Sequence, residues 1–126
     1  MKELRLDLET VIATQAATTD ATEPILGKLY AIRYVNGTID TGATLTITCR
    51  GYKLAAKPLL TLASADDCLL YPRDIVHAVA DGSVLSSAVG GDMDAPIVQG
   101  WIRAVIASGG GTTARIGQVY IYWEPL

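Results

Sequence analysis

The stretch Glu3-Leu4-Arg5-Leu6-Asp7-Leu8-Glu9 alternates charged residues with leucine without a break. Successive side chains of a β-strand point to opposite faces, so this pattern predicts a buried row of leucines and a solvated row of charges. Thr10 and Ile12 continue the leucine parity. We therefore predict a half-buried strand over residues 3–13 that lies at a sheet edge or extends as an arm.

The same period of two recurs along most of the chain. It predicts further strands at residues 25–35, 44–50, 98–107 and 116–123, and shorter ones at 59–62, 68–71 and 75–79. Residues 14–24 and 81–96 are rich in small and polar residues and predict loops, and helical periodicity is limited to a turn around 78–88. We predict an all-β fold for residues 1–126: a single-domain antiparallel β-sandwich, jelly-roll-like, with about seven or eight strands.

Three turn-rich segments separate these strands. Asn36-Gly37 is a strong hairpin signal, although Gly42 also allows a longer loop. Ser64–Asp67 has the spacing of a hairpin between two short apolar runs. Gly109-Gly110-Gly111 lacks the lysine and the helix that follow the glycines of a phosphate-binding loop, so it predicts a flexible hairpin between the last two strands.

The composition excludes several classes of protein. Half of the 126 residues are hydrophobic and 18% are charged, which is typical of a globular domain and not of a disordered chain. A net charge of −3 offers no basic surface to nucleic-acid phosphates. No apolar run approaches the ~20 residues of a membrane span, and the first residues lack the apolar core of a secretory signal. We expect a soluble protein, made in the cytoplasm, that binds neither nucleic acid nor membranes.

Few residues suggest catalysis. His77 is the single histidine and lies in an apolar run without a nucleophile motif, so we expect a structural role for it. Asp66-Asp67 and Asp92-Met93-Asp94 lack the ligand spacing of a calcium loop and predict solvated carboxylates. Cys49 and Cys68 lack zinc-ligand spacing and predict reduced, buried thiols. The chain is predicted to be no enzyme and to hold no cofactor or metal.

The last two predicted strands carry the residue types of a binding surface. Away from the core, one strand presents Trp101 and Arg103, and the other presents Tyr120 and Tyr122. Aromatic residues and arginine are enriched at the energetic centres of protein interfaces. If the two strands are neighbours, all four side chains share one sheet face. We predict a partner interface there, with cover by a loop or by the second sheet as the alternative.

Three segments of the sequence resemble one family. They are Tyr71-Pro72-Arg73 followed by His77 and Asp81-Gly82, Ile102–Gly110, and Gly117–Glu124. Together, from Ala43 to the C-terminus, they resemble a family of short proteins of tailed bacteriophages and prophages. The members are commonly encoded beside head genes and are regarded as virion structural or head-decoration (cement) proteins.

The resemblance implies a jelly-roll-like protein that binds the outside of the assembled head, over seams between capsid subunits, and stabilises it as an oligomer. Its implied partners are further copies of itself, as a dimer or trimer, and the phage major capsid protein. Its implied location is the capsid surface of the virion. Within the motif, Tyr71 can bury its ring and Arg73 can clamp a carboxylate. We expect a structural corner there in preference to a ligand site, and both residues join the predicted interface as a hypothesis.

Two other functions fit the same pattern. One is a tail or fibre-attachment module of a phage on the same fold. The other is a soluble ligand-binding β-barrel, which requires an internal apolar pocket in place of a filled core.

Overall fold

The computed structural model describes residues 1–51, 57–72, 74–75, 93–94 and 96–126, and every regular element within them is a strand. The strands are β1 (Lys2–Glu9), β2 (Ala17–Asp20), β3 (Ile25–Val35), β4 (Thr44–Arg50), β5 (Lys57–Leu62), β6 (Cys68–Leu70), β7 (Asp74–Ile75), β8 (Met93–Asp94), β9 (Ile97–Ala107) and β10 (Ile116–Pro125). All strand pairs are antiparallel, which confirms the predicted all-β class.

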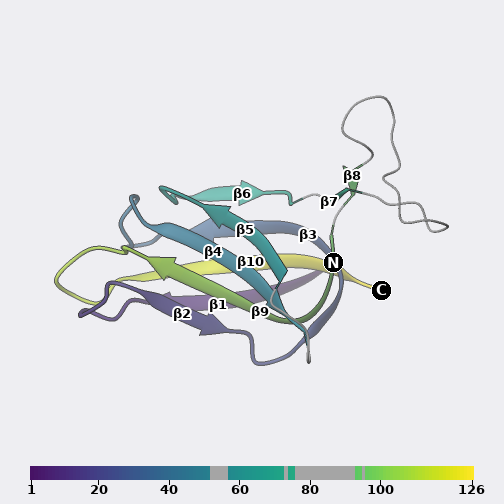
Figure 1. Ribbon diagram of the computed structural model, residues 1–126, viewed down its shortest axis with the longest axis horizontal. Helices are drawn as coiled ribbons and strands as arrows, with labels where there is room; N and C mark the ends of the chain where they lie inside the picture. Colours follow the sequence, from purple (N-terminus) through teal and green to yellow (C-terminus); the bar gives the residue numbers. More distant parts are fainter. Residues whose placement is uncertain (52–56, 73, 76–92, 95) are drawn as a thin grey trace.

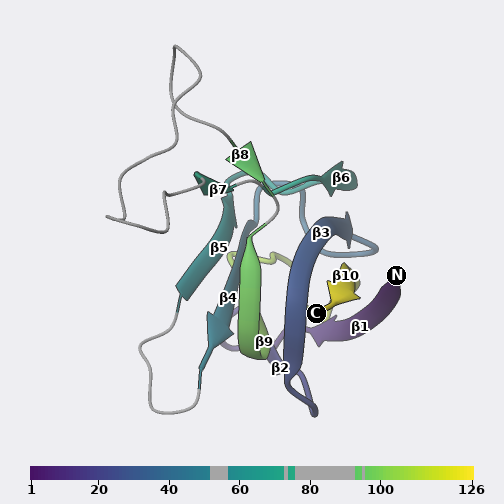
Figure 2. The same ribbon diagram turned by 90° about the vertical axis from the view of Figure 1, so that its right-hand side faces the viewer.

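Eight of the strands form one sheet that folds over into two layers (Figure 1). One layer contains β1, β10, β3 and β6, and the other contains β2, β9, β4 and β5. Figure 2 separates them, with β5, β4 and β9 to the left and β3, β10 and β1 to the right. The first residues of β9, Ile97–Gly100, pair with Ile25–Lys28 of β3 and join the layers, whereas its later residues pair with β4 and β2. The arrangement is the predicted β-sandwich, made from one continuous sheet.

One row of side chains from each long strand fills the space between the layers. Burying such a side chain contributes roughly 1.5–3 kcal/mol relative to leaving it in water, so these rows are the main source of stability. The largest fully buried side chains are Leu8, Leu29, Ile32, Tyr34, Ile39, Leu45, Ile47, Val98, Ile102, Ile106, Val119 and Ile121.

The N-terminal strand is shorter than predicted. Leu6, Leu8 and Thr10 are buried as their parity requires, but β1 ends at Glu9, and Ile12 is 58% exposed. The chain turns back where Val11 bridges Ala16, and residues 17–20 form β2 inside the predicted loop. A four-residue strand of small and polar side chains has too little apolar content to be recognised from its own sequence.

None of the three predicted hairpins joins paired strands. The segments 36–43, 63–67 and 108–115 each connect a strand of one layer to a strand of the other, because β3 does not pair with β4, nor β5 with β6, nor β9 with β10. The longer loop that Gly42 allowed is the one observed. Its Ile39 is buried, and the backbone N–H of Asn36 donates to the carboxylate of Asp67 at 2.8 Å, so two crossing segments support each other.

Gly100 lies where β9 changes partner, with Ile25 of β3 opposite it and Arg50 of β4 opposite the next residue. Its φ is +135°, a conformation that residues with a Cβ rarely adopt. A Cβ at this position would also overlap the carbonyl oxygen of Arg50. A glycine is therefore required where the sheet folds over.

Tyr34 is 1% exposed, and its hydroxyl has no hydrogen-bond partner among the described residues. Because an unpaired buried hydroxyl loses its hydration without compensation, Tyr34→Phe is expected to raise the free energy of unfolding by about 1 kcal/mol. Urea unfolding at neutral pH measures the change. Tyr122→Phe, on the half-buried outer face, is the control and is expected to change it by less than about 0.5 kcal/mol.

Burial, aided by the nearby Asp67, raises the pKa of Tyr34 from 10.0 to about 12. The unfolded chain therefore releases the proton first, so this group destabilises the fold as pH rises from about 10 to about 12. Tyr34→Phe is expected to remove the share of the stability loss at alkaline pH that comes from this hydroxyl. A variant less stable than the original at neutral pH would show instead that the hydroxyl has a partner.

Candidate functional site

The outer face of the β1-β10-β3-β6 layer contains an aromatic ring between two guanidinium groups. The sheet register places Arg5 of β1, Tyr120 of β10, Arg33 of β3 and Leu69 of β6 in one row across four strands. The guanidinium carbon of Arg5 lies 5.9 Å from the centroid of the Tyr120 ring, and that of Arg33 lies 5.5 Å from it. Both distances are those of cation–π contacts.

The two arginines differ in their remaining contacts. Arg5 donates through Nε to Oδ1 of Asp7 at 3.0 Å, and this hydrogen bond and the carboxylate charge raise the pKa of Arg5. Arg33 has no carboxylate within ion-pair distance among the residues that the structure describes. Arg33 is an exposed residue, and its guanidinium lies against Tyr120. A planar donor group held in this way matches an incoming carboxylate with two parallel hydrogen bonds.

More apolar surface surrounds this row. Tyr122 is half-buried two residues from Tyr120, and Leu69 is 48% exposed. Beside them the rings of Tyr30 and Tyr71 meet edge-on, with centroids 6.2 Å apart and planes at 87°. We call the set Arg5, Arg33, Leu69, Tyr120 and Tyr122 the aromatic face. Half-buried aromatics with a neighbouring arginine are the composition of an interface core.

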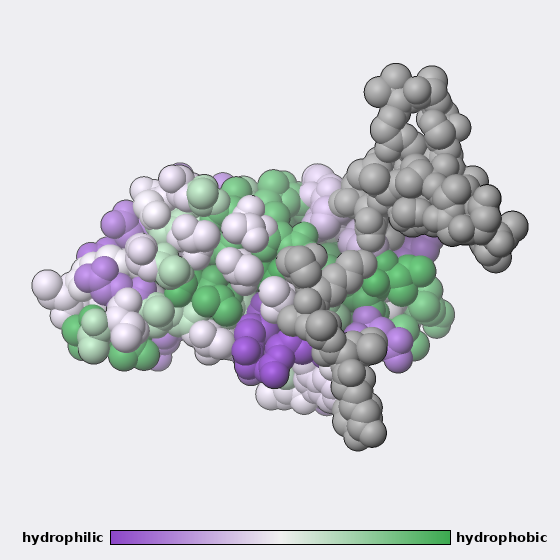
Figure 3. All heavy atoms as spheres, viewed as in Figure 1, coloured by the Kyte–Doolittle hydropathy of each residue, from purple (hydrophilic) through white to green (hydrophobic). Residues whose placement is uncertain are grey.

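Trp101 and Arg103 lie on the other layer. Arg103 donates through Nε and Nη2 to the two oxygens of Asp20 at 2.6 and 2.9 Å, and Nη1 of Arg50 lies 3.9 Å from the same carboxylate. The hydrogen bond from Arg103 lowers the pKa of Asp20. Figure 3 shows a hydrophilic patch over β9 and the end of β2, the two strands that contain Arg103 and Asp20. Arg103 is thus already paired within the chain.

The four residues of the predicted interface therefore do not share one face. Tyr120 and Tyr122 point outward from one layer, and Trp101 and Arg103 point outward from the opposite one, because the sheet folds over between β3 and β9 and places β10 and β9 in different layers. The expectation of a single face depended on these two strands being neighbours, and it is wrong. Tyr71 is 53% exposed, and Arg73 and His77 lie outside the described residues.

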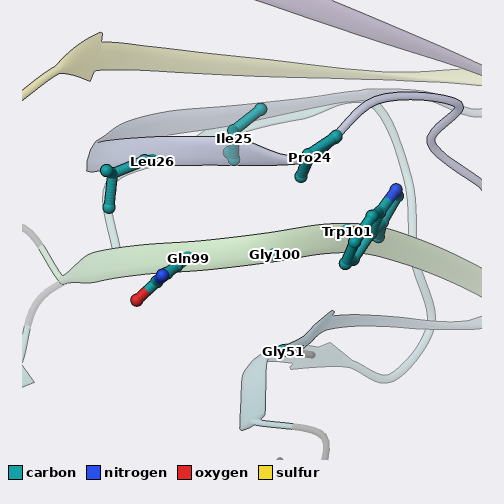
Figure 4. Close-up of a pocket in the computed structure, with 7 residues that line it drawn as sticks. All are labelled: Pro24, Ile25, Leu26, Gly51, Gln99, Gly100 and Trp101. Carbon is teal, nitrogen blue, oxygen red and sulfur yellow. The ribbon is translucent and has the colours of Figure 1, made fainter. Parts of the chain in front are cut away.

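A hollow of about 420 Å³ lies beside Trp101, where β3 and β9 meet (Figure 4). Pro24 and Leu26 form one side and Gln99 and Trp101 the other, and the Trp101 side chain points toward Pro24. Pro24, Leu26 and Gln99 are exposed, so the hollow opens on the surface and does not lie between the layers.

The aspartates and cysteines that were considered as metal ligands make structural contacts or lie outside the described residues. Asp67 accepts the Asn36 amide, and Asp66 accepts the amide of Asp67 at 2.7 Å. Cys49 is buried and Cys68 half-buried, and burial raises the pKa of the Cys68 thiol. In the described ranges, no three or more His, Cys, Asp or Glu side chains gather as a metal site would require. Asp92 lies outside those ranges.

Three members of the aromatic face, Leu69 and the two arginines Arg5 and Arg33, are not among the interface residues predicted from the sequence. Each arginine lies in its own strand among ordinary surface charges, and only the pairing of β1 and β3 with β10 brings them to Tyr120. Leu69 joins the row through the pairing of β6 with β3. The described part of the chain contains no helix long and apolar enough to cross a membrane. Comparison with family models, with curated proteins and with solved structures finds no match for this chain.

Proposed function

We propose that this chain is a structural protein of a tailed-bacteriophage particle that binds the outside of the assembled head as an oligomer and stabilises it. The observation that carries the proposal is the aromatic face, an outward-facing row in which Tyr120 lies between two guanidinium groups. The resemblance of residues 71–73, 102–110 and 117–124 to head-decoration proteins supports the same role. The proposal involves no catalytic step, no cofactor and no nucleic acid.

The proposed contact combines apolar and charged chemistry. Tyr120 and Tyr122 would pack on an apolar patch of the coat protein. Arg33, whose guanidinium lies against Tyr120, would pair with a coat carboxylate. A protein that binds only the assembled lattice stabilises that lattice by mass action. Many identical weak contacts across a capsid add avidity to this effect.

The composition of purified particles tests the proposal. Particles of the phage or prophage that encodes the chain are separated into heads without tails and free tails, and each fraction is measured by quantitative mass spectrometry. We expect many copies per head and density for the protein on the outer capsid surface in cryo-electron microscopy. Recovery with tails alone would favour the tail or fibre-attachment module, and absence from all particles would reject a virion role.

A further inference from the structure

The backbone of β1 has one edge without a partner near its start. The N–H of Thr10 donates to Arg115 on the β10 side, whereas the N–H of Val11 donates to Ala16 and the carbonyl of Asp7 accepts the Thr19 hydroxyl on the β2 side. Backbone groups of successive residues in an antiparallel strand point to alternate sides. The odd residues of β1 therefore direct their N–H and C=O groups away from β10.

The β2 strand reaches only part of this edge. The Thr19 contact with Asp7 lies near the far end of β2, and no described strand pairs with β1 at Glu3 or Arg5 on that side. Figure 2 shows β1 as the outermost strand of its layer, beside the N-terminus. An open strand edge is a template for another strand, and backbone hydrogen bonds supply the binding.

The charged residues along this edge, Glu3 and Arg5, are complementary to those of a second copy of β1. We propose that two copies of the chain pair through β1, antiparallel about a two-fold axis at Leu4, so that Glu3 of each copy lies opposite Arg5 of the other. The side chains of Glu3 and Arg5 are exposed on the same face, and Glu3 has no hydrogen bond or ion pair among the described residues. Arg5 contacts Asp7 of its own strand in an exposed ion pair, which leaves its other guanidinium donors for a second carboxylate. Opposite charges directly across a strand pair stabilise it, and this register provides two such pairs.

The neighbouring registers are unfavourable. An axis at Glu3 places the two Glu3 carboxylates opposite each other, and an axis at Arg5 does the same with the two Arg5 guanidiniums. An axis at Leu6 would require the edge at Asp7, whose carbonyl already accepts the Thr19 hydroxyl. Only the axis at Leu4 pairs opposite charges on the free part of the edge.

Pairing through β1 also enlarges the outer surface of the sheet. It joins two β1-β10-β3-β6 layers into one sheet and brings two aromatic faces side by side through their Arg5 rows. The half-buried Leu4 of each copy meets its symmetry mate on the core side of the sheet. The dimer gives a specific form to the oligomer of the proposed function, and its formation in solution requires no phage head.

Charge-exchange variants of the whole chain, with no residues added before Met1, test the proposal. Light scattering after gel filtration is expected to give twice 13.3 kDa for the original chain at high concentration. Glu3→Arg places arginine opposite arginine and Arg5→Glu places glutamate opposite glutamate, so each variant is expected to raise the dissociation constant at least tenfold. An equimolar mixture of the two variants restores both opposite-charge pairs and is expected to form a mixed dimer.

Thermal unfolding of each variant gives the control. Both side chains are exposed, so the fold is expected to survive their exchange, including the loss of the Arg5 contacts with Asp7 and Tyr120. The double variant, which exchanges both charges, is expected to form a dimer again. Three results would each overturn the proposal: a monomeric original chain at high concentration, a dimer that neither single variant weakens, or single variants that fail to associate when mixed.

Discussion

Replacing Gly100 by alanine is expected to lower the free energy of unfolding by at least about 3 kcal/mol, a large share of the stability of a domain of this size. Two costs add at this position. The backbone has a φ of +135°, and the new methyl group would overlap the carbonyl oxygen of Arg50. To relieve the backbone strain or the overlap, β9 would have to move at the point where it joins the two layers. Urea and thermal unfolding measure the loss.

Gly42→Ala is the matched control. Gly42 lies in an exposed loop without a positive φ, and its nearest neighbour to a new Cβ is Oδ1 of Asp40 at 3.8 Å. Alanine there is expected to be neutral or to stabilise the fold by less than about 1 kcal/mol, because it reduces the conformational entropy of the unfolded chain. If the free energy of unfolding of Gly100→Ala lay within about 1 kcal/mol of that of the original chain, the path described for β9 would be wrong.

The second large effect concerns the aromatic face. Tyr120→Ala is expected to weaken binding to assembled heads at least about 30-fold, which corresponds to about 2 kcal/mol, because it removes the central ring and the surface that positions Arg33. The fold is expected to survive, since Tyr120 is half-buried on the outer side of β10. Co-sedimentation of the variant with heads, at several protein concentrations, measures the change.

Trp101→Ala serves as the comparison for this prediction. It removes an aromatic side chain that is also half-buried, but on the outer face of the opposite layer. Its effect on head binding is expected to be less than threefold. If Trp101→Ala weakened binding and Tyr120→Ala did not, the contact surface would be the β2-β9-β4-β5 layer.

The sequence alone predicts which residues face the core, because the period of a strand is local. Leu6, Leu8, Val119 and Ile121 are buried as their alternation requires. Alternation says nothing about which strand lies beside which. For that reason Asn36-Gly37 was interpreted as a hairpin, although its strands belong to different layers.

The same limit affects the candidate site. Tyr120 and Tyr122 were recognised as outward-facing aromatics from their own strand. Arg5 and Arg33 lie far from Tyr120 in the sequence, and only the register of β1, β10 and β3 brings them to its ring. The placement of Trp101 on the opposite face depends on the same long-range pairing.

Titration of the purified protein onto heads from which it has been stripped tests the central claim most directly. We expect saturable binding to assembled heads, little binding to unassembled coat subunits, and heads that resist heating better as the sites fill. The reason is that a seam between subunits exists only in the assembled lattice. Equal binding to free coat subunits, or saturation without any gain in the heat resistance of the heads, would contradict the claim.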